Sequence, residues 1–279
     1  MTTPTTHTVN LRPDLPVTIT EAGAGRPALV LHGGGGPFTI AAIAEHLAET
    51  MHAVTPTHPG WNGTPRPDWV SGIDDIALAY LGFLEDNDLR DVLVVGSSLG
   101  GWIGAEMATR DDAGRISGLI LLDAVGVDVD GQPIRDFFAL DARGIAEYSF
   151  HDADRFYVDP VTVSDEQAAR QRANMATMKI VAGDPYMHDP TLLDRLRRIE
   201  IPVLVIWGDS DRIVTPRYGA AYAAAFGQAR LEIVHEAGHL PQLEQPAGTF
   251  ALIDDYVRQV TTARSNAARP PRSPSPMAA

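Results

Sequence analysis

The sequence predicts an α/β fold in which helices cover both faces of a mostly parallel, doubly wound sheet. Short apolar runs alternate with segments of helical periodicity, which is typical of strands joined by crossover helices. Several runs consist almost entirely of Val, Leu and Ile, as expected for strands buried on both faces. The alternation stops after Asp123 and resumes at Ile201, which indicates a segment inserted into the sheet domain.

Seven apolar runs are candidate strands, and five segments between them are candidate helices. The strands are expected at Val17–Thr20, Ala28–Leu31, Met51–Thr55, Val92–Val95, Leu119–Leu122, Val203–Trp207 and Leu231–Val234. The helices are expected at Ile40–Glu49, Ile73–Asp86, Leu99–Thr109, Arg217–Phe226 and Ala247–Thr261. Pro59-Gly60 and Asn62-Gly63-Thr64-Pro65 mark a turn-rich loop.

The chain divides into three predicted parts. Residues 1–124 and 201–262 form the core, residues 125–200 form a helical cap, and residues 263–279 form a disordered tail rich in Pro, Ser, Arg and Ala. The cap contains large apolar side chains that either line a ligand pocket or bury the cap on the core. They are Phe137, Phe138, Tyr148, Phe150, Phe156, Tyr157, Met175, Met178 and Met187.

The composition argues against several function classes. The formal net charge of −14 over 279 residues disfavours nucleic-acid and anionic membrane surfaces as partners. The absence of cysteine excludes thiol catalysis, disulfides and thiolate metal sites. The N-terminus lacks a basic region followed by an apolar run, and no run is long enough to cross a bilayer. We therefore expect a cytoplasmic protein without a membrane partner.

The segment from Val92 to Gly101 carries the strongest functional motif. An apolar strand runs into Gly96-Ser97-Ser98-Leu99-Gly100, and a helical segment follows at once. In this context the central serine lies on a sharp turn with its hydroxyl above the sheet, and the two glycines let the strand and helix pass close together. Ser98 is therefore the candidate nucleophile.

A serine nucleophile needs a base, and the base needs an acid that orients it. His239 follows a late strand on a loop in which Gly238 allows a turn, so it is the candidate base. Asp209 and Asp211 both follow the preceding strand and are candidate acids. The order Ser98, Asp211, His239 is the order expected for a catalytic triad on an α/β sheet.

The oxyanion of such a reaction needs backbone N–H donors. Leu99 directly follows the nucleophile at a helix N-terminus and is one candidate donor. The loop His32-Gly33-Gly34-Gly35-Gly36 follows an early strand, and its glycines permit close approach of the backbone to a ligand. This loop is expected to supply the second donor.

Together these motifs resemble the α/β-hydrolase superfamily over almost the whole chain except the two ends. The resemblance covers the His-Gly loop at His32, the nucleophile elbow, the acid motif from Trp207 to Val214, and Gly238-His239 followed by Pro-x-x-Glu-x-Pro. It implies the α/β-hydrolase fold with an inserted cap, Asp211 as the triad acid and Gly34 as the second oxyanion donor. It is closest to the branch of serine esterases and meta-cleavage-product hydrolases.

Two other interpretations involve the same residues. His235-Glu236-Ala237-Gly238-His239 spells the zinc-protease motif His-Glu-x-x-His, but that motif requires a helix, and Gly238 after a strand-like run disfavours one. Asp123, at the end of a strand, is an alternative triad acid, although a structural role suits it better. His32 and His58 are expected to be structural.

The sequence thus predicts a serine hydrolase that cleaves a small, apolar carboxylic ester or lactone through an acyl-enzyme, with no cofactor or metal. The first alternative is carbon–carbon bond hydrolysis of the meta-cleavage-product type, for which Arg170 or Arg172 could bind a substrate carboxylate. An alternative from another class is a receptor-like binding protein that retains the triad. The oligomeric state stays open, with a homodimer among the candidates.

Overall fold

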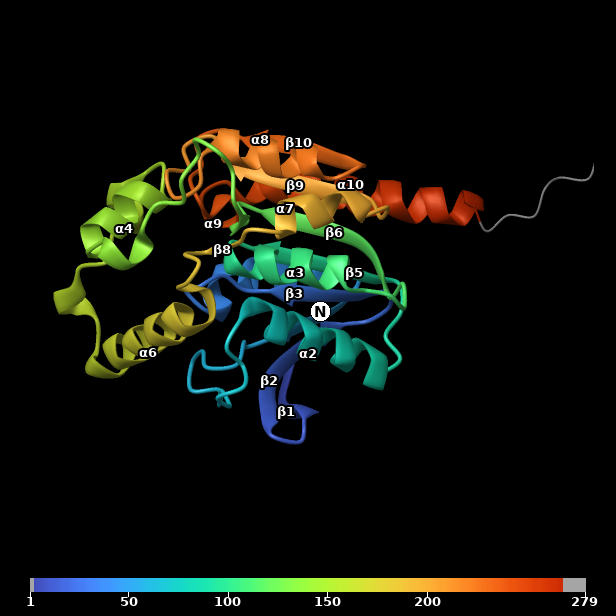
Figure 1. Cartoon of the computed structure of the whole chain (residues 1–279), viewed down its shortest axis with the longest axis horizontal. Helices are drawn as coiled ribbons and strands as arrows, with labels where there is room; N and C mark the ends of the chain where they lie inside the picture. Colours follow the sequence, from blue (N-terminus) through green and yellow to red (C-terminus); the bar gives the residue numbers. More distant parts are fainter. Residues whose placement is uncertain (1–2, 268–279) are drawn as a thin grey trace, which may run out of the picture.

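The computed structural model describes residues 3–267 and contains one central sheet of eight strands (Figure 1). The strand order is β1-β2-β4-β3-β5-β6-β9-β10. The strands are β1 (Thr5–Arg12), β2 (Leu15–Gly23), β3 (Pro27–Leu31), β4 (His52–Pro56), β5 (Val92–Ser97), β6 (Ile116–Leu122), β9 (Val203–Gly208) and β10 (Ala229–Val234). From β4 to β10 all neighbours are parallel, whereas β2 is antiparallel to both β1 and β4.

Helices cover both faces of this sheet, so the predicted fold class is confirmed. The helices α2 (Ile73–Asp86), α3 (Leu99–Thr109) and α8 (Pro216–Ala225) pack on one face, and α1 (Ala41–Leu47) and α10 (Pro246–Ala267) pack on the other. Alternate residues of each central strand belong to opposite cores: in β5, Val92 and Val94 face α2 and α3, and Leu93 and Val95 face α1 and α10. Burial on both faces explains the continuous apolar runs.

The order of the strands also creates the place for a site. The chain passes from β3 outward to β4 and then returns through α2 to β5, on the other side of β3. The loops that follow β3 and β5 therefore diverge from a topological switch point, where α/β sheets bind their ligands. His32–Gly36 is the first of these loops, and Ser98 begins the second.

Residues 125–200, which we call the cap segment, connect β6 to β9. They contain β7 (Gly126–Val127), α4 (Ala142–Ser149), α5 (Ala153–Phe156), α6 (Asp165–Ala182), β8 (His188–Asp189) and α7 (Leu192–Arg195). In Figure 1, α4 and α6 stand apart from the sheet at its left. Ser164 starts α6 with a capping box, in which its hydroxyl accepts the Gln167 N–H and the Gln167 side chain accepts the Ser164 N–H.

The strand β1 and the end of α10 differ from the expected elements. The polar strand β1 is an edge strand with mostly exposed side chains, so it lacks the apolar run that would predict it. The helix α10 continues to Ala267, past the expected start of the tail at residue 263, because the chain there contains Ala and Arg and has no proline before Pro270. The rest of the predicted tail, residues 268–279, lies outside the described residues.

Candidate active site

Ser98 lies on the turn between β5 and α3 in a strained backbone conformation, with φ of 53° and ψ of −116°. Non-glycine residues rarely adopt positive φ, and such strain gathers at functional sites. The neighbouring glycines make the turn possible. A side chain at residue 96 would collide with the backbone of Gly100, and one at residue 100 would collide with the backbone of Leu31.

The structure brings together three residues that are far apart in the sequence. Nε2 of His239 lies 2.8 Å from Oγ of Ser98, and Nδ1 of His239 lies 2.8 Å from Oδ2 of Asp211. All three side chains are buried or nearly so. The arrangement matches the hydrogen-bond chain that a nucleophile, a base and an orienting acid form in serine hydrolases.

The two candidate acids have different partners. Oδ1 of Asp211 accepts hydrogen bonds from the N–H groups of Ile213 and Val214, which leaves Oδ2 directed at His239. Asp209 instead accepts from the Ser210 hydroxyl, and its Oδ2 lies 3.0 Å from Nδ1 of His235. The geometry therefore places Asp211, and not Asp209, beside His239.

The residues of the His-Glu-x-x-His motif do not form a metal site of the zinc-protease kind. They lie in the turn after β10 and not on a helix. The side chain of His235 is 86% exposed and faces Asp209, whereas His239 is buried and faces Ser98. The two imidazoles thus have separate partners, and the motif is a coincidence of sequence.

The loop after β3 runs beside Ser98. A Cβ atom at Gly33 would lie 3.3 Å from Cβ of Ser98, and the Gly34 carbonyl accepts a hydrogen bond from Nε1 of Trp61. Leu99 is the first residue of α3, so its N–H has no acceptor within the helix. Gly33 therefore lies beside Ser98 and Leu99 directly follows it, and Gly34 and Leu99 stay the predicted oxyanion donors.

Comparison with known proteins assigns the chain to a family. The model of the alpha/beta hydrolase family matches residues 28–252, which is well over half of the chain. The chain belongs to the alpha/beta hydrolase family. This result confirms the resemblance on which the sequence analysis relied.

Relatives of this hydrolase include enzymes that act on different bonds. The 2-hydroxy-6-oxo-2,4-heptadienoate hydrolase of Pseudomonas putida is 25% identical over 263 residues, which cover 85% of this chain and 91% of the relative. Lipase 1 of Psychrobacter immobilis is 25% identical over 249 residues, which cover 79% of this chain and 73% of the relative. The solved structure of a bacterial membrane phospholipase A superposes with a TM-score of 0.77 at 22% identity, covering 92% and 87% of the two chains, which shows a shared fold.

No helix within residues 3–267 of the hydrolase is both long and apolar enough to cross a bilayer.

A buried chain of rings supports the loop after β3. Nδ1 of His32 lies 2.7 Å from the Gly33 carbonyl, and Nε2 of His32 accepts the N–H of His58. His58 in turn contacts the Tyr80 hydroxyl through Nδ1, at 2.7 Å. Burial lowers the pKa of His32 to about 4, so this imidazole is neutral at pH 7. Both histidines thus have structural partners.

Two buried side chains near the site were not singled out from the sequence. Nε2 of Gln242 donates to the Thr39 carbonyl and to Oγ of Ser97, and so joins the segment after β3 to the end of β5. The Glu244 carboxylate accepts the N–H groups of Gly238, His151 and Asp152. Both belong to the Pro-x-x-Glu-x-Pro motif after His239, which was the available signal.

The helix α6 of the cap segment lies against the loops that follow β3 and β4. On the loop after β4, Asn174 exchanges two hydrogen bonds with Asn62, and the Thr177 hydroxyl donates to the Gly60 carbonyl. A side chain at Gly34 would collide with Sδ of Met178. One face of α6 therefore covers the predicted oxyanion loop.

Most of the other large apolar side chains of the cap segment pack against one another or beneath charged groups. Phe150 stacks on Phe156 with ring centroids 4.5 Å apart, and the Arg135 guanidinium lies over the Tyr148 ring. Phe138 contacts Tyr186 edge to face. These contacts give the aromatic residues a structural role. Among the residues of the predicted lining, Met178 contacts the glycine loop at Gly34.

The arginines considered as ligands for a substrate carboxylate lie on the solvent side. Arg170 is exposed and pairs with Glu166 on the same helix, and Arg172 is also exposed. Neither observation favours contact with a ligand at Ser98.

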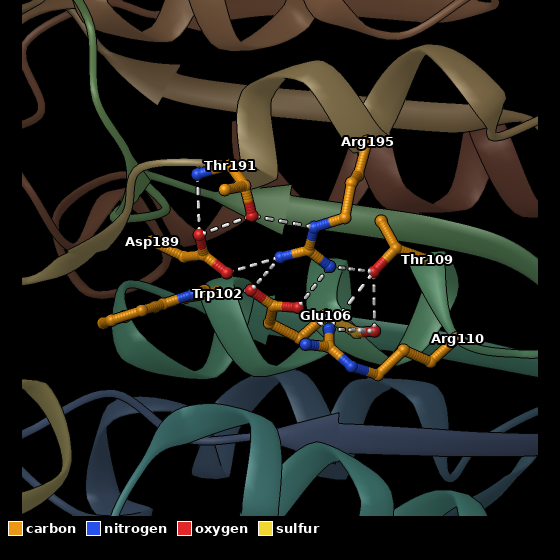
Figure 2. Close-up of polar contacts among 7 residues, drawn as sticks. All are labelled: Trp102, Glu106, Thr109, Arg110, Asp189, Thr191 and Arg195. Atoms are coloured by element: carbon orange, nitrogen blue, oxygen red, sulfur yellow. Dashed lines mark hydrogen bonds and ion pairs between the residues drawn. The ribbon is translucent and has the colours of Figure 1, made fainter.

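The helix α3, which begins directly after Ser98, is also joined to the cap segment by an ionic cluster (Figure 2). Glu106 on α3 has an exposed fraction of 1%, and both its oxygens accept hydrogen bonds from Arg195 on α7, at 2.8 and 2.9 Å. Arg195 also donates to Asp189, and Arg110 pairs with Glu106 from the other side. Two carboxylates and two guanidiniums thus balance their charges.

Proposed function

We propose that the protein is a serine hydrolase that cleaves small carboxylic esters or lactones through an acyl-enzyme. The observation that carries the proposal is the hydrogen-bond chain from Ser98 through His239 to Asp211. His239 takes the proton of Ser98 as the hydroxyl attacks the carbonyl, and Asp211 holds the ring and stabilises the imidazolium. His239 then protonates the leaving oxygen. Water next attacks the acyl-enzyme with His239 as the base, and His239 returns the proton to Ser98 as the acyl group leaves.

In this mechanism the N–H groups of Gly34 and Leu99 stabilise the oxyanion. The loss of one such donor costs about 3–4 kcal/mol of transition-state stabilisation. Met178 packs against the same loop, so an apolar group bordering the reacting carbonyl fits the site better than a charged one. No metal or cofactor takes part in this mechanism.

Ser98→Ala tests the proposal. We expect the variant to lose hydrolysis of aryl esters by at least about 10⁴-fold and to lose covalent labelling by a fluorophosphonate probe, because the attacking oxygen is gone. Ser71→Ala, which removes an exposed hydroxyl that contacts Asp75, is the matched control and should keep both. Full activity or full labelling of Ser98→Ala would disprove the role of Ser98.

Carbon–carbon bond hydrolysis is the second candidate, and the Pseudomonas putida relative supports it. A substrate panel separates the two. Simple aryl esters and lactones should be turned over with higher kcat/KM than a vinylogous diketone acid if the ester proposal is correct. The opposite ranking favours the second candidate. Tight binding of a ligand with no turnover of any of these would favour the receptor-like alternative.

A further inference from the structure

Asp123 is a fully buried carboxyl group beside the triad. It follows β6 with a positive φ of 43°, and its exposed fraction is 0%. Its N–H donates to the Ile206 carbonyl, and its Oδ1 accepts the N–H of Gly208 at 2.9 Å. Both partners lie on β9, the strand that leads to Asp211. The backbone therefore fixes Asp123 beneath the loop of the predicted triad acid.

The second oxygen of Asp123 has no hydrogen-bond donor. Oδ2 is buried and unpartnered among the described residues. One oxygen of Asp123, one oxygen of Asp211 and one ring nitrogen of His239 all lie within 4.8 Å of one another. A buried oxygen without a donor is costly, but a protonated carboxyl would itself supply an O–H. Asp211 is the acidic side chain that lies beside this carboxyl.

The surroundings determine which carboxyl holds the proton. Asp211 accepts two backbone N–H groups in addition to its contact with His239, whereas Asp123 accepts one. Two carboxylates this close cannot both be charged at low cost. Burial, and then the charge of Asp211, raise the pKa of Asp123 well above its usual value, and Glu244 acts in the same direction. The charge therefore belongs on Asp211 and the proton on Asp123.

We infer that Asp123 is a neutral carboxylic acid that donates its O–H to the Asp211 carboxylate and acts as a positioning residue for the triad acid. The acid of the triad is then a unit of two carboxyl groups with a single negative charge. Asp123 restrains the Asp211 carboxylate without adding charge beside the His239 imidazole. The inference rests on the proposed function, because restraint of Asp211 affects catalysis only if Asp211 is the triad acid.

Asp123→Asn is the decisive variant because an amide N–H can replace the O–H while its oxygen still accepts from Gly208. A neutral Asp123 predicts that this substitution leaves the midpoint of the His239 imidazole titration, followed by NMR, within about 0.3 pH units of wild type. An ionised Asp123 predicts a different result: removal of its charge would move the midpoint by about one unit or more to lower pH. The second result would overturn the inference.

Infrared spectroscopy gives a second readout that needs no substrate. The wild-type protein at pH 7 should show a protonated-carboxyl band that Asp123→Asn lacks and that Asp209→Asn, a nearby acid that pairs with His235, retains. Absence of the band from wild type contradicts the inference. Neither measurement depends on turnover, so the two claims can fail separately. If both expected results are observed but no ester is hydrolysed, the inference about Asp123 and Asp211 is supported and the proposed function is contradicted.

Kinetics then test the positioning role. Asp123→Asn should keep kcat/KM for an aryl ester within about threefold, and Asp123→Ala should lose about tenfold in kcat, because it removes the donor and leaves the Gly208 N–H unpaired. Equal activity of folded Asp123→Ala and wild type would contradict the role. If Asp123→Ala does not fold, a loss of more than tenfold in Asp123→Asn would be the contradicting result.

Discussion

At the scale of single residues, burial determines the protonation state of His32. The ring has an exposed fraction of 0%, donates to the Gly33 carbonyl and accepts from the His58 N–H, so both nitrogens are used by the neutral form. Protonation would convert the accepting nitrogen into a donor that faces another donor. Burial is also the main cause that lowers the pKa of His58, and His32 adds to it.

The low pKa of His32 predicts a loss of stability in acid. The unfolded chain binds the proton near pH 6.5 and the folded chain only near pH 4, so the stabilisation is complete above about 6.5 and decreases as the pH falls toward 4. The full difference corresponds to roughly 3 kcal/mol. Urea unfolding at pH 7 and pH 4.5 measures it. His32→Gln should be less stable at pH 7 and lose less on acidification.

His7→Gln is the matched control, because His7 lies on β1 with a side chain 42% exposed. Its decline in acid should equal that of wild type. A His32→Gln variant that declines as steeply as wild type would assign the acid sensitivity to other groups.

The residues that could be predicted from sequence are those whose local surroundings carry the signal. Ser98 stands between an apolar strand and a helix, and both signals are visible in the sequence. The glycines at 96 and 100 are also visible there, and they mark positions where the backbone packs too closely for a side chain. Glu244 lies in the Pro-x-x-Glu-x-Pro motif, but its contacts could not be predicted, because its three partners come from two segments that meet only in the folded chain. The protonation of Asp123 likewise depends on burial that no neighbouring residue in the sequence reveals.

At the scale of elements, the pattern of apolar residues predicted the buried strands but did not predict the exposed strand β1. The expected helices at Ile73–Asp86 and Leu99–Thr109 agree with α2 and α3 in both bounds. The short strands β7 and β8 of the cap segment are two-residue pairs, too short for any periodicity to predict them. No sequence pattern predicted that α7 contacts α3, because Arg195 and Glu106 are far apart in the sequence and meet only where the folded chain returns to α3.

The contact between α3 and α7 predicts a large cost for loss of Glu106. Glu106→Ala leaves Arg195 and Arg110 close together without the carboxylate that both contact, and breaking a buried pair in this way costs about 3–5 kcal/mol. Urea unfolding at pH 7 measures the loss. Glu147→Ala on α4 removes an exposed partner of Arg143 and should cost less than about 1 kcal/mol. Similar costs for the two variants would show that the cluster in Figure 2 adds little stability.

At the scale of the whole molecule, the proposed triad depends on contacts between the cap segment and two loops of the sheet. The Ser149 carbonyl accepts the N–H of His239 at 2.7 Å, and the Tyr148 carbonyl accepts the N–H of Arg212 at 3.1 Å. The end of α4 therefore supports the loops of both the base and the acid. Movement of the cap segment would be transmitted to the geometry at Ser98.

Glu244 is the side chain through which this coupling can be tested. Its carboxylate accepts Gly238 N–H at 2.6 Å on the loop of the base, and the N–H groups of His151 and Asp152 on the cap segment. Glu244→Ala removes these acceptors together. We expect faster hydrogen exchange in both segments and a fall in kcat/KM of up to about 10²-fold, because small displacements of a catalytic group cost this much.

Gln245→Ala, which removes an amide that contacts the Glu236 carbonyl on the same loop, is the control and should change neither exchange at residues 149–152 nor kcat/KM beyond about twofold. Faster exchange in Glu244→Ala at residues 149–152 alone, with unchanged exchange at residues 236–239 and unchanged turnover, would show that the base keeps its position without the cap segment. Faster exchange in both segments with a loss in kcat would instead show that the cap segment is part of the machinery that places His239.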